Sequence, residues 1–178
     1  MDFSEKTIKS DLKFQGRVFN VRVDTVKLLD GSTSTREIIE HSGGVAVVAI
    51  DEDNNVYMVR QFRKPYEKTI LEIPAGKRNA DEDPFDCGVR ELEEETGLKS
   101  KNVTYLGCFL PSPGYTAEVI HLYLAQDLYE GTVNLDEGEF LSVEKHHIDE
   151  LTDMIMNNEI QDGKTVIGIL KARKYLNL

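Results

Sequence analysis

GKRNADEDPFDCGVRELEEETGL, residues 76–98, is the most informative stretch of this 178-residue sequence. It predicts a helix whose two ends are both marked by suitable residues. Asp83 can cap the N-terminus through its carboxylate, Pro84 fits the first helical position, and Gly97 can adopt the left-handed conformation that ends a helix. We therefore expect one helix between Asp83 and Gly97.

The predicted helix has one apolar face and one acidic face. On a wheel of 3.6 residues per turn, Phe85, Val89 and Leu92 form a stripe that we expect to face the core. Glu91 and Glu95 lie one turn apart on another face, and like charges at this spacing destabilise a helix by about 0.2–0.5 kcal/mol per pair. The spacing alone fits either a solvated acidic face or a site for a hard divalent cation.

The composition predicts a compact soluble protein. The sequence has 21 Lys and Arg against 32 Asp and Glu, a formal net charge of −11, and 40% of its residues are apolar. Because this acidic excess repels the phosphates of nucleic acids and anionic membranes, we expect neither as a partner. Two cysteines are too few for a disulfide framework, and the N-terminus lacks an apolar leader, so we expect a cytoplasmic protein.

The rest of the chain is predicted to be rich in strands. Alternating apolar residues over 18–28 and 35–41, separated by Asp30-Gly31, predict an N-terminal antiparallel hairpin or meander. The apolar run 45–50 predicts a strand buried on both faces, followed by a second strand over 56–62. Further strands are expected over 70–73, 103–110 and 119–125, and helices over 147–158 and 164–176.

Two other patterns are set aside. Asp51-Glu52-Asp53 starts like a calcium-binding loop, but Val56 replaces the glycine that such a loop needs, and we interpret it as a strand turn. Gly163-Lys164-Thr165 is similar to the end of a phosphate-binding loop, but the residues before it do not fit that motif. We interpret it as the start of the last helix.

Residues 76–98 match the pattern GX5EX7REUXEEXGU, in which U is a bulky aliphatic residue, at every defined position. The stretch therefore resembles the Nudix box. The resemblance implies an α+β fold of the α/β/α sandwich type, with a mixed β-sheet between helices. It places the Nudix domain at residues 43–178 and leaves residues 1–42 as an additional N-terminal antiparallel β segment.

The resemblance also implies a metal-dependent hydrolase of phosphoanhydride bonds. Glu91, Glu95 and the main-chain carbonyl of Ala75 occupy the positions that hold metal ions in the family. Arg90 and Glu94 occupy catalytic positions, where the arginine orients the carboxylates. The implied cofactor is Mg²⁺, for which Mn²⁺ can substitute, because such ions take oxygen ligands and offset the charge of phosphate oxygens.

Several segments outside the box resemble the ADP-ribose pyrophosphatase subfamily. Pro113, fifteen residues after Leu98, and Gly114 match its downstream loop. Arg36 lies in an Arg-Glu-Ile segment similar to that of the subfamily, and Arg63 resembles a substrate-contacting arginine. The resemblance therefore implies substrate binding by these four residues, although a rigid turn and surface ion pairs are the alternative interpretations.

An acidic loop after the predicted strands completes the implied site. Asp136-Glu137-Gly138-Glu139 resembles the segment that supplies the general base in these enzymes. On this resemblance Glu137 is assigned as the base and Glu139 as a metal ligand, and the reverse assignment stays open. Without the resemblance, two glutamates in a glycine-containing loop indicate only a solvated loop.

Three functional hypotheses follow. The first is hydrolysis of ADP-ribose to AMP and ribose 5-phosphate. The second is a pyrophosphatase for another nucleoside-diphosphate sugar or a dinucleotide, a hypothesis that Tyr115 keeps open. The third is a non-catalytic Nudix-fold nucleotide sensor, against which the complete acidic set argues. By resemblance, the N-terminal segment is expected to be exchanged between two chains, which predicts a homodimer.

Overall fold

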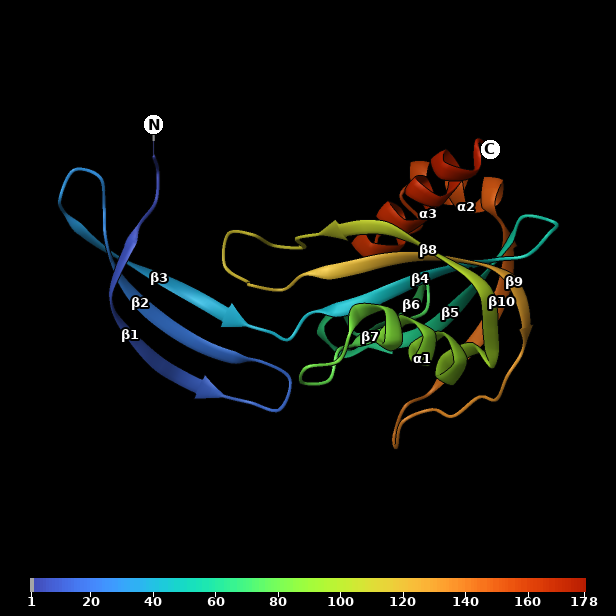
Figure 1. Cartoon of the computed structure of the whole chain (residues 1–178), viewed down its shortest axis with the longest axis horizontal. Helices are drawn as coiled ribbons and strands as arrows, with labels where there is room; N and C mark the ends of the chain where they lie inside the picture. Colours follow the sequence, from blue (N-terminus) through green and yellow to red (C-terminus); the bar gives the residue numbers. More distant parts are fainter. Residues whose placement is uncertain (1) are drawn as a thin grey trace. The chain divides into compact units, whose positions relative to one another are not determined.

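The computed structural model describes residues 2–178, which form two compact units (Figure 1). The first unit runs up to Gly43 and includes Leu110–Val119. The second comprises Gly44–Phe109 and Ile120–Leu178.

The first unit is built on a three-stranded antiparallel sheet. Its strands β1 (Lys6–Gln15), β2 (Asn20–Lys27) and β3 (Thr33–Glu40) lie in that order across the sheet. The two strands expected in this region are confirmed as β2 and β3. Strand β1 was not predicted, although Ile8, Leu12 and Phe14 alternate with polar residues in the way that favours a strand; it is exposed at nearly every residue.

The second unit contains a mixed seven-stranded sheet with the strand order β10-β5-β4-β9-β8, in which β6 pairs with β5 and β7 with β4. Strands β4 and β9 run parallel, whereas the other pairs are antiparallel. This confirms the mixed sheet. The strands are β4 (Gly44–Ile50), β5 (Asn55–Arg63), β6 (Lys68–Glu72), β7 (Ala75–Lys77), β8 (Leu98–Phe109), β9 (Ile120–Glu130) and β10 (Leu141–His147).

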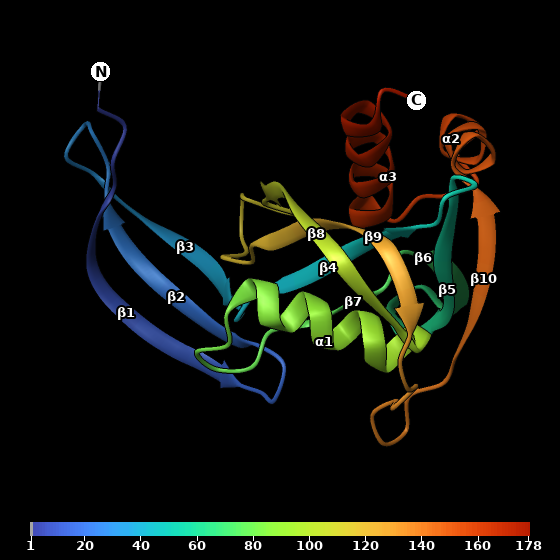
Figure 2. The same ribbon diagram turned by 45° about the vertical axis from the view of Figure 1, so that its right-hand side comes forward.

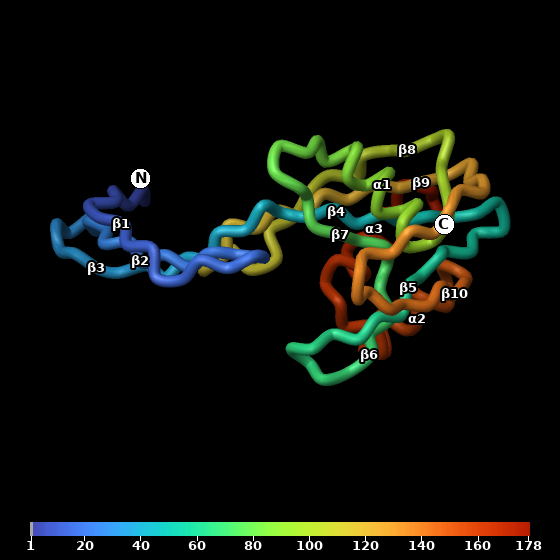
Figure 3. Tube along the Cα trace, turned by 90° about the horizontal axis from the view of Figure 1, so that it is seen from below, coloured from blue at the N-terminus to red at the C-terminus, as the bar shows by residue number. Residues whose placement is uncertain are grey.

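Helices cover both faces of this sheet, as Figures 2 and 3 show. Val45 and Val47 of β4 pack toward α1 (Pro84–Thr96), whereas Val48 and Ile50 pack with α2 (Ile148–Met156) and α3 (Gly163–Leu176). Because side chains alternate across a strand, one wholly buried strand serves both layers. The predicted α/β/α sandwich and its doubly buried central strand are confirmed.

Helix α1 has the predicted ends. The Asp83 carboxylate accepts a hydrogen bond from the Phe85 N–H at 2.8 Å, and Gly97 ends the helix with φ 68°. The predicted apolar stripe was partly wrong, because Phe85 is 45% exposed and the buried face includes Cys87 and Gly88 beside Leu92. A Cβ on Gly88 would lie 3.0 Å from Val45 Cγ1, so the helix packs close to the sheet through small residues.

The remaining elements follow the predictions with different lengths. Strands expected over 70–73, 103–110 and 119–125 are confirmed as β6, β8 and β9, and the two C-terminal helices are confirmed as α2 and α3. Strands β7 and β10 were not predicted, since β7 is only three residues long and β10 carries charged residues at the edge of the sheet. Within residues 2–178, no helix combines the length and apolarity needed to cross a membrane.

Candidate active site

Helix α1 places Arg90 among the acidic side chains of the box. Its guanidinium donates to Glu82 at 2.8 Å and to Glu94 at 2.7 Å, and an Arg90 nitrogen lies 2.7 Å from Glu91. The hydrogen bond from Arg90 lowers the pKa of Glu82 to about 2, and Glu82 in turn accepts the Asn79 N–H. The arginine therefore offsets the repulsion within the acidic cluster and joins the helix to the preceding loop.

Glu95 is held separately from this arginine cluster. Its side chain is 3% exposed and accepts a hydrogen bond from the Ala75 N–H at 3.0 Å, which links α1 to β7. Burial raises the pKa of Glu95 to about 8, and the charges of Glu91 and Glu139 act in the same direction. Burial likewise raises the pKa of Glu91 to about 6. Ionisation of these two carboxylates is therefore unfavourable without a cation, and a bound cation would stabilise their charged forms.

Gly76 lets the backbone of β7 approach α1 closely. A Cβ at this position would lie 1.9 Å from the carboxyl carbon of Glu91 and about as close to both carboxylate oxygens. The space that a side chain would take is therefore occupied by the Glu91 carboxylate. The glycine of the box is required by this contact.

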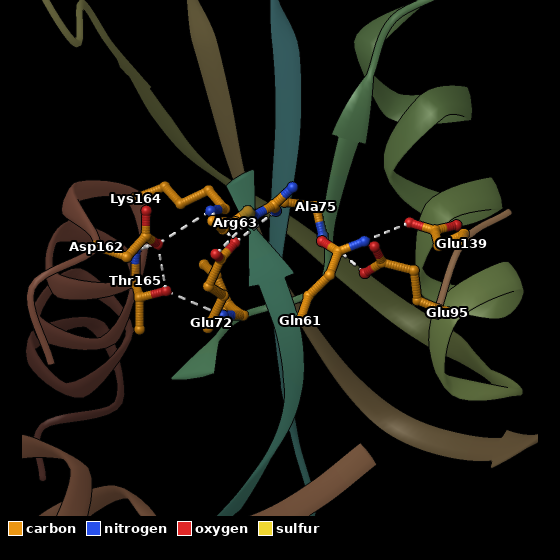
Figure 4. Close-up of polar contacts among 10 residues, drawn as sticks. Gln61, Arg63, Glu72, Ala75, Glu95, Glu139, Asp162, Lys164 and Thr165 are labelled. Atoms are coloured by element: carbon orange, nitrogen blue, oxygen red, sulfur yellow. Dashed lines mark hydrogen bonds and ion pairs between the residues drawn. The ribbon is translucent and has the colours of Figure 1, made fainter. Parts of the chain in front are cut away.

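The loop after β9 is attached to the C-terminal end of α1. Gly131 N–H donates to the Gly97 carbonyl at 2.8 Å, and Asn134 N–H donates to the Glu94 carbonyl at 3.0 Å. Further along, Glu139 accepts a hydrogen bond from Gln61 Nε2 at 2.8 Å (Figure 4). The loop thereby brings Glu139 close enough for its charge to raise the pKa of both Glu91 and Glu95.

Glu137 lies exposed on the same loop. Within residues 2–178 its carboxylate makes no hydrogen bond or ion pair, so the structure does not bring it to the box residues as it does Glu139.

Arg63, at the end of β5, is bound on its inner side by Glu72 (Figure 4). Two nitrogens of the guanidinium donate to the two carboxylate oxygens at 2.8 Å and 2.6 Å. Glu72 is 1% exposed and also accepts a hydrogen bond from Lys164. Burial alone would raise the pKa of Glu72, but the bonds from Arg63 and Lys164 outweigh it and lower the pKa.

A cavity of about 470 Å³ lies beside Arg63. It is open to solvent and lined by β5, β6, the short 3₁₀ helix η1 (Lys64–Tyr66) and the connection from α2 to α3. Its size is within the range of small-ligand sites. Its lining includes Arg60, Tyr66, Leu71, Met154 and Lys164.

The other predicted substrate residues belong to the first unit. Arg36 on β3 pairs with Glu5 through its Nε, at 2.8 Å, and through Nη2. Pro113 and Gly114 lie in the loop Leu110–Val119, which is fastened to β3 because Ile39 N–H donates to the Tyr115 carbonyl at 2.7 Å. The second unit contains Arg63 and the box residues.

Known families match the two parts of the chain. The sequence profile of the NUDIX domain matches residues 40–166. The chain belongs to the Nudix family. A second profile, described as the nucleoside diphosphate sugar hydrolase N-terminal domain, matches residues 5–39, so the N-terminal β segment of this Nudix protein also has relatives of its own.

Individual relatives cover nearly the whole Nudix chain. It is 47% identical over 99% of its length to a methanol dehydrogenase activator of Bacillus methanolicus, of which 94% is covered. It is 42% identical over 98% of its length to an ADP-ribose pyrophosphatase of Bacillus subtilis, of which 93% is covered. A crystal structure of an ADP compounds hydrolase superposes with a TM-score of 0.87 at 20% identity, covering 99% of this chain and 97% of that one, and shows the same fold.

The Nudix box residues suit a divalent ion, which Nudix hydrolases generally need. They offer the carboxylate and carbonyl oxygens that hard cations prefer, and burial, with a smaller contribution from neighbouring carboxylates, raises the pKa of Glu91 and Glu95 in the absence of an ion. Among residues 2–178, no three His, Cys, Asp or Glu side chains stand close enough to form a ready ligand set. Arg90 contacts one oxygen of Glu91, and the Ala75 N–H is bonded to one oxygen of Glu95, so each carboxylate keeps a second oxygen for an ion.

Sequence reasoning missed several residues that organise this Nudix site. Gln61 holds Glu139 across 78 residues of sequence, and Lys164 reaches Glu72 across 92. Gln61 lies in the predicted strand that also carries Arg63, and Lys164 lies at the predicted start of the last helix. Neither local pattern indicates that Gln61 contacts Glu139 or that Lys164 contacts Glu72.

Proposed function

We propose that this protein hydrolyses the pyrophosphate bond of ADP-ribose, producing AMP and ribose 5-phosphate. The observation that carries the proposal is the gathering of Glu91, Glu95 and Glu139 around one end of α1, with Arg63 nearby. This site occurs in a chain that is 42% identical over nearly its full length to an ADP-ribose pyrophosphatase. The site residues support cleavage of a pyrophosphate bond, and the relative supports ADP-ribose as the substrate.

We assign the metal ligands to the carboxylates of Glu91, Glu95 and Glu139 and to the carbonyl of Ala75. Mg²⁺ is the proposed ion, with Mn²⁺ as a substitute, because the ligands are all oxygen atoms. A bound divalent ion offsets charge on the pyrophosphate oxygens and lowers the pKa of the attacking water. The Ala75 N–H and Arg90 position two of these carboxylates before any ion binds.

The protein's own groups then position the substrate and accept a proton. The 2.7 Å hydrogen bond from Arg90 to Glu94 fixes the positions of both side chains on the acidic face of the helix. Glu137 accepts the proton of the attacking water, an assignment supported by its exposed and unpaired carboxylate within the described chain. Exchange of roles between Glu137 and Glu139 is the alternative, and Glu137→Gln and Glu139→Gln variants would separate them through their metal affinities.

Substrate binding is assigned to Arg63 and to residues of the first unit, namely Arg36, Pro113 and Gly114. We further propose that two chains form a homodimer through their N-terminal segments and that the protein works in the cytoplasm. The exposed apolar residues of β1 support the first of these proposals. The cysteines Cys87 and Cys108, both free thiols, support the second.

The decisive experiment is a substrate screen. Purified protein is incubated in Mg²⁺ with ADP-ribose, NADH, GDP-mannose, diadenosine polyphosphates and CoA, and phosphate is released from the products by an added phosphatase. The proposal expects ADP-ribose to give the highest kcat/KM and chromatography to identify AMP and ribose 5-phosphate. Preference for GDP-mannose, NADH or a diadenosine polyphosphate would support the second hypothesis instead. Nucleotide binding without turnover of any substrate would support the sensor hypothesis.

A second candidate function is activation of a methanol dehydrogenase, favoured by the 47% identity to a protein with that name. The test adds wild-type protein or Glu95→Gln to a purified methanol dehydrogenase and follows the rate of alcohol oxidation. A rate increase by the wild type alone would mean that activation depends on the box. No increase with either protein would exclude activation of the dehydrogenase tested.

A further inference from the structure

Glu72 is a buried carboxylate shared by two cations. Arg63 reaches it from β5 with two hydrogen bonds, and Lys164 reaches it from the first turn of α3. The side chains of Lys164 and Glu72 are 12% and 2% exposed, so this ion pair is largely removed from water. Such an arrangement needs both cations to be placed accurately, because a buried charge without its partner is costly.

The N-terminus of α3 holds Lys164 rigidly. Asp162 caps the helix by accepting the Thr165 N–H at 3.0 Å and the Thr165 hydroxyl at 2.6 Å, and it lies 3.1 Å from Lys164 Nζ. Thr165, which is fully buried, accepts the Ile73 N–H at 2.9 Å. The same helix end therefore fixes both Lys164 and the backbone of Ile73, directly after Glu72.

Arg63 is held on one side and available on the other. The bidentate pairing with Glu72 uses two of the five N–H groups of a guanidinium, and within residues 2–178 the Arg63 guanidinium has no other hydrogen-bond partner. Its side chain is 36% exposed and lines the 470 Å³ cavity. Glu95 lies near enough for its charge to contribute to the raised pKa of Arg63, after the larger contribution of Glu72.

We propose that Lys164 is a positioning residue, which acts through Glu72 to orient the free N–H groups of Arg63 toward an anionic group of the substrate. The inference rests on the proposed hydrolysis of ADP-ribose. Lys164 supplies a second positive charge to the Glu72 carboxylate. Arg63 can therefore keep the planar bidentate geometry that fixes the direction of its guanidinium. Without Lys164, Arg63 is the remaining cation on Glu72 and turns inward.

The test compares Lys164→Met with Lys68→Met. Lys68 lines the same cavity and has the same charge, but its hydrogen bond goes to Gln161 at 3.0 Å and not to Glu72, which makes it a matched control. We expect Lys164→Met to raise KM for ADP-ribose between about 10-fold and about 100-fold, with a smaller change in kcat. Lys164→Arg, which keeps the positive charge, should restore most of the loss.

A merely structural role for Lys164 predicts a lower melting temperature and an unchanged KM in the folded protein, and that result would overturn the proposal. If Lys164→Met does not fold, Lys164→Gln removes the charge while keeping a hydrogen-bond donor and takes its place. A KM increase in Lys68→Met equal to that in Lys164→Met would also contradict the proposal, because general charge loss at the cavity would then explain both.

A double-mutant cycle with Arg63→Met tests the route of action. If Lys164 acts through Arg63, the Lys164→Met change should raise KM by less than about twofold in the Arg63→Met background. Independent, multiplicative effects would overturn the positioning role. Wild-type hydrolysis with no effect of Lys164→Met would refute this inference alone. A wild-type protein that hydrolyses no pyrophosphate would refute the proposed function and this inference with it.

Discussion

Glu95 illustrates how a single residue combines a structural contact with a charge that the fold alone does not compensate. Its carboxylate is almost completely buried, and its hydrogen-bond donor is the neutral N–H of Ala75. Desolvation therefore dominates, and the pKa rises to about 8. In the metal-free protein near neutral pH the group is mainly protonated, and a cation that binds there must displace the proton.

Changing Glu95 to Gln should abolish most of the metal-dependent hydrolysis while leaving the fold intact. Glutamine keeps the oxygen that accepts the Ala75 N–H but loses the negative charge that binds a cation. We expect kcat/KM to fall by at least about 100-fold, measured with ADP-ribose in Mg²⁺. Asp86→Asn, an exposed residue on the same helix, should retain wild-type activity. Full activity in Glu95→Gln would mean that the site is elsewhere.

Glu95 should also give the metal-free protein, in EDTA, an unusual pH dependence of its free energy of unfolding. Because the pKa of Glu95 is raised from 4.5 to about 8, the folded state binds more protons than the unfolded state between these pH values. Its contribution to the free energy of unfolding therefore falls as pH rises from about 4.5 to about 8. The loss is on the order of a few kcal/mol, since each pKa unit corresponds to about 1.4 kcal/mol.

Urea denaturation at several pH values measures this effect. Wild-type protein should lose stability from pH 5 to pH 8 relative to Glu95→Gln, and the variant should be the more stable of the two at pH 8. Saturating Mg²⁺ should reverse the order, because the ion stabilises only a protein that can ionise at this position. Parallel pH profiles for the two proteins in EDTA would show that Glu95 titrates normally.

At the scale of elements, the site depends on the close approach of strand β7 to helix α1. The helix packs on the sheet through Cys87 and Gly88, and the Ala75 N–H reaches Glu95 across the gap. At Gly76 the missing side chain leaves the space that the Glu91 carboxylate occupies. The box glycine is thus explained by contact between two elements, and its backbone does not adopt a positive φ.

Gly76→Ala should reduce turnover strongly and stability only slightly. The added methyl group overlaps the carboxylate of Glu91, which is the flexible end of a side chain and can move away without displacing the backbone. We expect kcat/KM to fall between about 10-fold and about 100-fold, whereas the free energy of unfolding changes by less than about 1 kcal/mol. Gly163→Ala, where a Cβ meets nothing within 4 Å, is the control. Equal activity of both variants would contradict this explanation.

At the scale of the whole molecule, the sheet of the first unit is poorly covered within one chain. The side chains of Ile8, Leu12 and Phe14 on β1 are 57%, 56% and 53% exposed. A three-stranded sheet needs a covered apolar face to be stable, and exposed apolar patches of this kind commonly mark interfaces. This is the physical basis for the proposed homodimer.

Light scattering coupled to size-exclusion chromatography should therefore give a mass of about 40 kDa, twice the 20.2 kDa of one chain. Replacing Leu12 and Phe14 together by Asp should produce a monomer, since buried carboxylates without partners oppose association. If Arg36, Pro113 and Gly114 of the first unit bind the substrate of the partner chain, this variant should also lose ADP-ribose turnover. A wild-type mass of 20 kDa at micromolar concentration would refute the dimer.

Local patterns allowed much of the second unit to be predicted. The caps of α1 and the buried strand β4 follow from neighbouring residues, because cap chemistry and side-chain alternation act over a few positions. Strands β7 and β10 escaped prediction because they carry little apolar periodicity, whereas the alternation in β1 is a signal that could have found it. The apolar stripe of α1 was misjudged at Phe85, since small residues can form a buried face when two elements pack closely.

The family, its characteristic box and the acidic face of α1 could all be read from the order of residues 76–98, because they depend on one helix and the turn before it. The environment of that face required the folded chain. Ala75 meets Glu95 across 20 residues, Gln61 meets Glu139 across 78, and Lys164 meets Glu72 across 92. Burial and long-range contacts set the pKa of Glu95 and Glu72 and the direction of Arg63, and no local pattern carries that information.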